Sequence, residues 1–361
     1  MTISAVRVAV RVSDALDRVV LTPEEPNELH RIGSVLKRVL PSLPVRRTAE
    51  GLAVRSADAH LLAELDRSME PADGVALVWD AMSRRFVANR RLARAAHPRV
   101  HKMVQDLVDG VRVGVRTPGT LGRADVLDDH QETNVRAMTL PGGFGTCVFD
   151  EQGTGKTVSL IFAFDALVDA NETDVGLIVA PKSMVGEWAY DFRRFTGDLY
   201  SVATLTGTRD EKMKALTSGA DVLLTNFETV VSFERELEAF LRAREGRVIL
   251  GVDESYHVKN LDAQRTRVVR RLREWCGRTF VLCGTPAPNS PDDVIQQFNI
   301  VDFGVTFDGV RIPKDRSAAQ LVVRQAMGDR GIFVRSLKAN VLRDLPAKRF
   351  HKVFVKLVGK Q

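Results

Sequence analysis

A glycine-rich turn at residues 149–157 (FDEQGTGKT) follows a short apolar segment and constrains this chain more than any other feature. Gly153 and Gly155 can adopt backbone conformations closed to other residues, so that successive N–H groups can point at phosphate oxygens. Lys156 would reach the β- and γ-phosphates, and the Thr157 hydroxyl would bind Mg²⁺. Residues 158–170 have the pattern of a helix, whose positive N-terminal end would face the anion. The turn therefore predicts a site for a nucleoside triphosphate.

Composition excludes several classes of protein. Hydrophobic residues make up 44% and charged residues 27% of the 361 positions, which is ordinary for a globular protein of one large or two smaller domains. The three cysteines lack metal-binding spacing, and residues 1–14 alternate like a strand rather than a signal peptide. No apolar run approaches the ~20 residues of a membrane helix. We expect a cytoplasmic protein without a membrane partner, and the net charge of +6 permits a polyanionic one.

Short apolar segments alternate with amphipathic ones through the middle of the chain. This alternation predicts an α/β fold with a mainly parallel sheet covered on both faces, which binds ligands at the carboxyl ends of its strands. The predicted strands are 147–149, 176–180, 200–205, 222–225, 248–252 and 279–283, and the predicted helices are 158–170, 184–195, 233–242 and 263–275.

The two ends of the chain have other patterns. Residues 1–122 predict a smaller α+β accessory domain, with a strand at 3–12, helices at 29–40 and 57–69, and a linker at 117–122. Residues 123–303 form the predicted nucleotide-binding lobe. Residues 304–361 form a predicted C-terminal extension, with helices at 318–325 and 337–345 and a strand at 350–357.

An acidic pair follows the strand predicted at 248–252. In a nucleotide-hydrolysing site, Asp253 would hold Mg²⁺, usually through water, and Glu254 would position and deprotonate the attacking water. An Asp-Glu pair is by itself more often a solvated strand end. Its place after the phosphate-binding turn, on another strand of the same predicted sheet, favours the catalytic interpretation.

The ordered motifs resemble the first, RecA-like motor lobe of the Swi/Snf-type ATPases of helicase superfamily two. The turn is similar to that family's Asp-Glu-x-Gly-x-Gly-Lys-Thr, in which an aspartate, here Asp150, replaces the first glycine of other phosphate loops. The resemblance covers residues 124–361. It rests also on LDDHQ at 127–131, APKSMVGEW at 180–188, LTNFE at 224–228, DESYHVKN at 253–260, LCGTPAPN at 282–289, and VRSLK with LPAK at 334–338 and 345–348.

The resemblance implies ATP with Mg²⁺ as cofactors and translocation along double-stranded DNA as the activity of a complete motor. Gln131 would contact adenine, and the phosphate cradle would comprise Gln152, Gly153, Thr154, Gly155, Lys156 and Thr157. DNA backbone phosphates would contact Lys182, Ser183, Gly207, Thr225 and Asn226. Such contacts position the protein and do not read the base sequence. Tyr256, Gly284 and Thr285 would couple the nucleotide site to the rest of the motor.

Three departures from the family pattern affect these expectations. Tyr256 stands where the family has a histidine, which puts the coupling in doubt, and Ser336 replaces an arginine. The sequence also ends at Gln361, where the family continues into a second motor lobe with catalytic arginines. We therefore expect this lobe to bind ATP but to hydrolyse it poorly without that partner.

A basic segment at 84–102 is a second candidate DNA contact through Arg90, Arg91 and Arg94, although a solvated helix would have the same composition.

Two other functions of the whole chain stay open. One is a non-enzymatic nucleotide-dependent adaptor, and the other is the motor half of a restriction-type machine.

Overall fold

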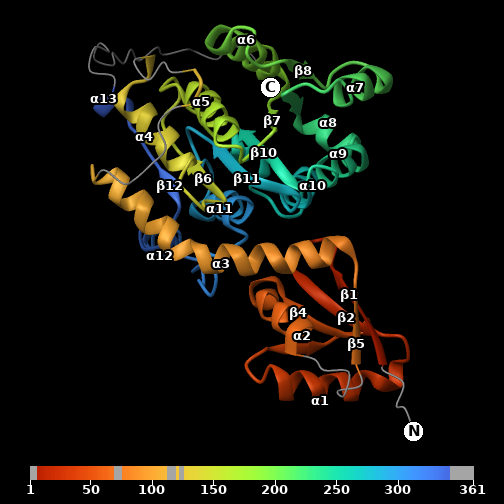
Figure 1. The fold of residues 1–361 in the computed structure, drawn as a ribbon. Coiled ribbons are helices and arrows are strands. Elements are labelled where there is room, and N and C mark those ends of the chain that lie inside the picture. Colours follow the sequence, from red (N-terminus) through yellow and green to blue (C-terminus); the bar gives the residue numbers. More distant parts are fainter. Residues whose placement is uncertain (1–5, 69–74, 112–118, 122–125, 342–361) are drawn as a thin grey trace, which may run out of the picture.

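The computed structural model describes residues 6–68, 75–111, 119–121 and 126–341, which form two sheets joined by one long helix (Figure 1). The larger sheet has seven strands in the order β12-β6-β11-β10-β7-β9-β8, and each neighbouring pair is parallel. Its strands are β6 (Gly145–Val148), β7 (Val175–Ala180), β8 (Val202–Thr204), β9 (Val222–Asn226), β10 (Gly246–Asp253), β11 (Cys276–Leu282) and β12 (Phe333–Val334). The predicted α/β class with a parallel sheet is confirmed.

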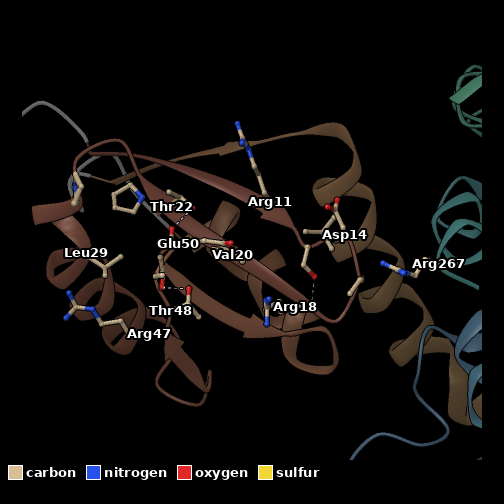
Figure 2. Close-up of a pocket in the computed structure, with 17 residues that line it drawn as sticks. Arg11, Asp14, Arg18, Val20, Thr22, Leu29, Arg47, Thr48, Glu50 and Arg267 are labelled. Carbon is tan, nitrogen blue, oxygen red and sulfur yellow. Dashed lines mark hydrogen bonds between the residues drawn. The ribbon is translucent and has the colours of Figure 1, made fainter. Parts of the chain in front are cut away.

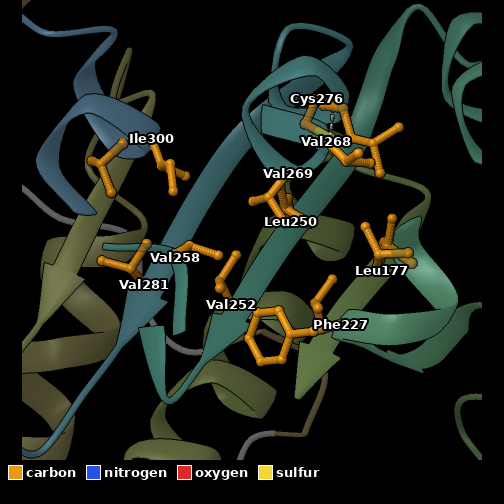
Figure 3. Packing of buried hydrophobic residues seen from close by; sticks show 14 of the residues in the cluster. Leu177, Phe227, Leu250, Val252, Val258, Val268, Val269, Cys276, Val281 and Ile300 are labelled. Carbon is orange, nitrogen blue, oxygen red and sulfur yellow. Dashed lines mark hydrogen bonds between the residues drawn. The ribbon is translucent and has the colours of Figure 1, made fainter. Parts of the chain in front are cut away.

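Side chains of the parallel strands alternate between two apolar clusters, because successive residues of a strand point to opposite faces. Leu177 and Val179 belong to one cluster, and Ile178 and Ala180 to the other. Figure 3 shows the first cluster, in which Leu250 and Val252 of β10 pack beside Phe227, Val268 and Val269 of the covering helices.

Helices cover both faces of this sheet. One face carries α3 (Ala81–Val108), α4 (Asp129–Met138), α5 (Lys156–Asp169) and α6 (Val185–Thr196). The other carries α7 (Arg209–Leu216), α8 (Phe227–Ser232), α9 (Glu234–Arg242), α10 (Gln264–Arg273), α11 (Ile295–Asp302) and α12 (Arg316–Arg330). The short helix α13 (Lys338–Val341) follows β12. The predicted helix at 337–345 lies partly, and the predicted strand at 350–357 entirely, outside the described residues.

The smaller sheet has the order β3-β4-β2-β1-β5, with β1 and β5 parallel and the other pairs antiparallel. Its strands are β1 (Val6–Val12), β2 (Arg18–Pro23), β3 (Val45–Arg47), β4 (Leu52–Arg55) and β5 (Val75–Trp79). The helices α1 (Leu29–Val39) and α2 (Leu62–Ser68) pack with it around a separate apolar cluster. The smaller α+β unit is therefore present as predicted.

The helix α3 belongs to both units. Phe86 and Val87 enter the apolar cluster of the smaller sheet, whereas Val100 and Val104, further along the helix, enter a cluster of the larger one. Figure 1 shows α3, in orange, running between the two sheets. A division of the chain at residue 122 remains a proposal. The helix α3, which lies N-terminal to that residue, is shared by the two units.

Candidate nucleotide site

Most of the motifs predicted to act together follow strands of the seven-stranded sheet, whereas Gln131 lies on α4, before β6. Because these strands are parallel, their carboxyl ends lie at one edge, and the segments that leave them meet there. The phosphate loop follows β6, the acidic pair ends β10, and the residues Gly284 and Thr285 follow β11. The segment at 335–338 follows β12, the strand next to β6.

The phosphate loop has the backbone that the sequence predicts. Gly153 has φ +77° and Gly155 has φ +86°, both in the left-handed region that favours glycine. A Cβ on Gly155 would also overlap the amide of Gln131, so glycine is needed there for space as well. The Lys156 ammonium donates hydrogen bonds to the carbonyl oxygens of Asp150 (2.9 Å) and Glu151 (3.2 Å), which places it across the loop.

Asp150 has a structural task at the position where other phosphate loops carry glycine. Its side chain is fully buried, and one carboxylate oxygen accepts a hydrogen bond from the Asn134 amide at 2.7 Å. The other oxygen accepts from the backbone N–H of Ser336 at 2.6 Å. The carboxylate therefore joins the loop to α4 and to the segment after β12, a task that glycine could not perform.

Gln131, the predicted adenine contact, lies against the phosphate loop. Its amide nitrogen donates to the Thr154 carbonyl at 3.0 Å, and its oxygen accepts from the Asp128 N–H at 3.1 Å. His130, which the sequence reasoning assigned no role, contacts the same Thr154 carbonyl at 2.8 Å. Both side chains thus hold the loop, and contact with adenine stays a prediction.

The acidic pair lies at the end of β10 next to the loop. The Trp188 indole N–H donates to Asp253 at 2.8 Å, and the Gln152 amide donates to Glu254 at 3.4 Å. Burial raises the pKa of the Asp253 carboxyl. Burial and the neighbouring Asp253 charge raise the pKa of Glu254. Glu254 also has φ +45°, a strained conformation of the kind found at functional sites.

These groups fit a hydrated divalent cation. Magnesium prefers oxygen ligands and usually keeps several waters, so one carboxylate and one hydroxyl suffice on the protein side. Asp253 and Thr157 would supply them, and their role as Mg²⁺ ligands stays a prediction. The second carboxylate oxygen of Glu254 is buried and has no hydrogen-bond partner among the described residues, which leaves it available to a water or substrate group.

The phosphate loop lies against the segment after β11, where coupling residues were predicted, and Gln297 of α11 joins the acidic motif to that segment. A Cβ on Gly284 would lie 2.7 Å from Cγ of Gln152, so this glycine permits close contact with the phosphate loop. Gln297, which sequence reasoning missed, accepts from the Ser255 hydroxyl at 2.6 Å and donates to the Pro286 carbonyl at 2.6 Å. Gln297 is one of two adjacent glutamines in α11, and neither its type nor its spacing carries a sequence signal for such a bridge.

Tyr256 stacks on the neighbouring His257 with ring centroids 4.5 Å apart, and His257 contacts Phe227 at 5.0 Å. This ring contact links the acidic motif to the residues after β9. Thr285 is exposed. The coupling roles of Tyr256, Gly284 and Thr285 stay predictions.

The predicted DNA contacts divide into exposed and buried residues. Lys182 and Ser183 are exposed after β7, and Gly207 is exposed with φ +83°, where any Cβ would overlap Glu211. The side chains of Thr225 and Asn226 are instead buried, and the Asn226 oxygen accepts from the Thr229 N–H at 2.8 Å to begin α8. Their side chains therefore cannot meet DNA in this conformation, because both are packed inside the lobe.

The prediction that Arg90 contacts DNA is wrong. Its guanidinium is buried, forms an ion pair with Glu274 at 2.8 Å and donates to the Phe86 carbonyl at 2.9 Å. Arg94 forms an ion pair with Asp308. The segment at 84–102 lies within α3, and its composition did not reveal that the Arg90 face of this helix packs against the lobe. Arg91 is exposed, and its contact with DNA stays a prediction.

A hollow of about 1060 Å³ lies away from this site, on the smaller sheet (Figure 2). Its lining includes Arg11, Arg18 and Arg47 together with Asp14 and Glu50, so it carries both signs of charge. It lacks the converging strand ends of the candidate nucleotide site.

None of the helices that the structure describes combines the length and the apolar character of a membrane-spanning segment.

Comparison with known proteins gives a family. The model of the SNF2-related domain matches residues 130–361. The SWI/SNF-related matrix-associated actin-dependent regulator of chromatin subfamily A-like protein 1 of Xenopus tropicalis is 27% identical over 219 residues, which cover 57% of this chain and 22% of that protein. The DNA repair and recombination protein RAD54-like of Gallus gallus is 25% identical over 225 residues, or 56% of this chain and 29% of that protein.

The fold is similar to a solved structure described as the Sulfolobus solfataricus SWI2/SNF2 ATPase core in complex with dsDNA. The TM-score is 0.51 at 20% identity, and the match covers 65% of this chain and 49% of that one. The chain spans less than a third of the length of either curated relative. It belongs to the SNF2-related family, the Swi/Snf-type ATPases of helicase superfamily two.

Proposed function

We propose that this chain is the ATP-binding first lobe of a DNA-dependent ATPase that moves along double-stranded DNA. The observation that carries the proposal is that Lys156, at the start of α5 beside Thr157, acts electrostatically on both carboxyls of the acidic pair, Asp253 and Glu254. The relatives support it, because one is named a DNA repair protein and one solved structure is described as an ATPase core with dsDNA.

Each group has a distinct task in this proposal. Lys156 exchanges its two loop carbonyls for phosphate oxygens, which are stronger partners because they are charged. Thr157 and Asp253 hold Mg²⁺, which offsets charge on the phosphate oxygens. Glu254, whose pKa burial raises, orients the attacking water and accepts its proton.

We further propose that turnover needs a second lobe. In related phosphoryl-transfer sites an added arginine raises the rate by about 10³–10⁵. The match to the solved ATPase core covers 49% of that chain, which is consistent with one lobe of two. The Mg²⁺ ligands, phosphate cradle and predicted adenine contact all lie on this chain, so nucleotide binding does not require the partner.

The first experiment measures ATP binding by calorimetry with Mg²⁺. We expect wild type to bind, Lys156→Ala to lose binding, and Gln131→Ala to weaken it, because the alanine at 131 removes a hydrogen bond that holds the loop. Lys214→Ala, which removes an exposed lysine on α7, is the matched control and should bind as wild type does. Equal affinity of wild type and Lys156→Ala would refute the phosphate-loop assignment.

A further inference from the structure

The segment after β12 is bonded to the phosphate loop through three backbone groups. The Ser336 N–H donates to the Asp150 carboxylate at 2.6 Å, and the Glu151 N–H donates to the Ser336 carbonyl at 3.0 Å. The Lys338 N–H donates to the Glu151 carboxylate at 2.7 Å. These bonds join residues more than a hundred positions apart in the sequence, and they fix where the side chain of Lys338 begins.

The Lys338 side chain extends over the loop at Gly153. Its ammonium nitrogen lies 3.2 Å, and its Cε 3.5 Å, from the point that a Cβ on Gly153 would occupy. Gly153 has φ +77°, a backbone conformation that favours glycine, and a side chain there would have to displace the end of the Lys338 side chain. The Lys338 side chain thus lies beside the phosphate cradle, in space that a side chain at position 153 would otherwise occupy.

The ammonium of Lys338 forms no hydrogen bond or ion pair with another described residue, although the residue is half-buried. A partly desolvated cation gains from an anionic partner. The Glu151 carboxylate accepts a hydrogen bond from the Lys338 backbone N–H, whereas the Lys338 ammonium lies beside Gly153 of the cradle. By contrast, Lys156 rests on two loop carbonyls.

We propose that Lys338 is a second cationic ligand for the phosphate groups of the bound nucleotide. The inference rests on the proposed function, since it places a residue in the same ATP site. Lys156 approaches the phosphates from the start of α5, and Lys338 approaches from the segment after β12. Nucleotide affinity would then depend on a segment that lies outside the phosphate loop, and any movement of that segment would change it.

The test compares ATP, ADP and adenosine binding to the full chain with Lys338→Gln and Lys338→Arg. A charged hydrogen bond contributes roughly 1.5–3 kcal/mol, so Lys338→Gln should bind ATP and ADP at least ~10-fold more weakly, with a smaller dependence on salt. Adenosine affinity should be unchanged, and Lys338→Arg should recover much of the loss. Lys314→Gln, an exposed lysine before α12, controls for net charge.

The outcomes separate this inference from the proposed function. If Lys156→Ala abolishes ATP binding and Lys338→Gln leaves it unchanged, the inference is overturned and the proposed function stands. If Lys338→Gln weakens adenosine as much as ATP, the lysine braces the loop and does not bind phosphate, which also overturns it. If wild type binds no nucleotide, the proposed function fails and the inference fails with it.

Discussion

At the scale of single residues, the candidate site depends on positions where the backbone conformation, the available space or the hydrogen bonds suit one type of residue. Gly155 has φ +86° and faces the Gln131 amide, whereas Asp150 holds two hydrogen-bond donors that glycine could not. Glu254 has φ +45° although it is not glycine, so the surrounding structure holds it in that conformation. The loop thus keeps its shape before any ligand binds, which is what a phosphate cradle needs.

Gly155→Ala should destabilise the protein and impair ATP binding. The left-handed conformation costs a residue with a Cβ roughly 1–2 kcal/mol, and the overlap with Gln131 adds to that. Gly186→Ala, within α6, is the matched control, because a Cβ there meets nothing within 4 Å and alanine favours a helix. Urea unfolding of both variants measures the difference. A Gly155→Ala protein as stable as Gly186→Ala would contradict the strain argument.

At the scale of elements, α3 connects the two sheets and carries the buried ion pair of Arg90 and Glu274. Asn89 also donates to both the carbonyl and the carboxylate of Glu274, at 2.8 Å each. Arg94 reaches Asp308 from the next turn of the same helix. These contacts hold α3 against the lobe, so a helix that looks like a nucleic-acid contact by composition has a mainly structural face.

Arg90→Ala should lower the free energy of unfolding by about 3–5 kcal/mol, because the buried Glu274 carboxylate keeps the Asn89 hydrogen bond but loses its cationic partner. Arg91→Ala, the adjacent exposed residue, should change stability by less than ~0.5 kcal/mol. Chemical unfolding gives both values. Duplex binding measured at several salt concentrations would then show whether Arg91 contacts DNA, since loss of a phosphate contact reduces the salt slope. Equal stability of the two variants would exclude the proposed role of the ion pair.

At the scale of the whole molecule, the candidate nucleotide site lies on the larger sheet, and the smaller sheet contacts that lobe through α3 and through Arg270 and Arg271 of α10. The phosphate loop, the acidic pair and the segment after β11 form one connected edge through Gln152, Gly284 and Gln297. In the proposed motor, a second lobe would dock on that edge, because it carries the groups proposed to bind the phosphates.

The isolated chain should show near-background ATPase activity and gain orders of magnitude when a RecA-like second lobe with catalytic arginines and duplex DNA are supplied. The physical reason is that, in the proposed two-lobe motor, the second lobe supplies a positive charge on the transferring phosphoryl group, worth about 10³–10⁵ in rate. Steady-state phosphate release measures it, with Lys156→Ala in the same assembly as the control. Robust DNA-stimulated turnover by a verified monomer of this chain alone would show that the arginine comes from within.

Much of this protein follows from local sequence patterns. The near-continuous apolar strands predicted the parallel sheet, and the position of Gly153–Thr157 and Asp253 after two of them placed the site at one edge. Both signals are local, because strand burial appears as a run of apolar residues and a phosphate turn as glycines at fixed spacing. The resemblance of the tail to the family motif also indicated that residues 334–338 are significant, but it assigned them no function.

Tertiary structure alone decided which polar side chains meet. The bonds of Asp150 to Ser336, of Ser255 to Gln297 and of Arg90 to Glu274 join residues far apart in the chain, and no periodicity records such a pairing. An arginine in a helix is either a solvated charge or one partner of a buried ion pair, and what packs against the helix decides which. The sequence by itself therefore determined the fold class and the location of the site, whereas packing determined which residues hold that site in shape.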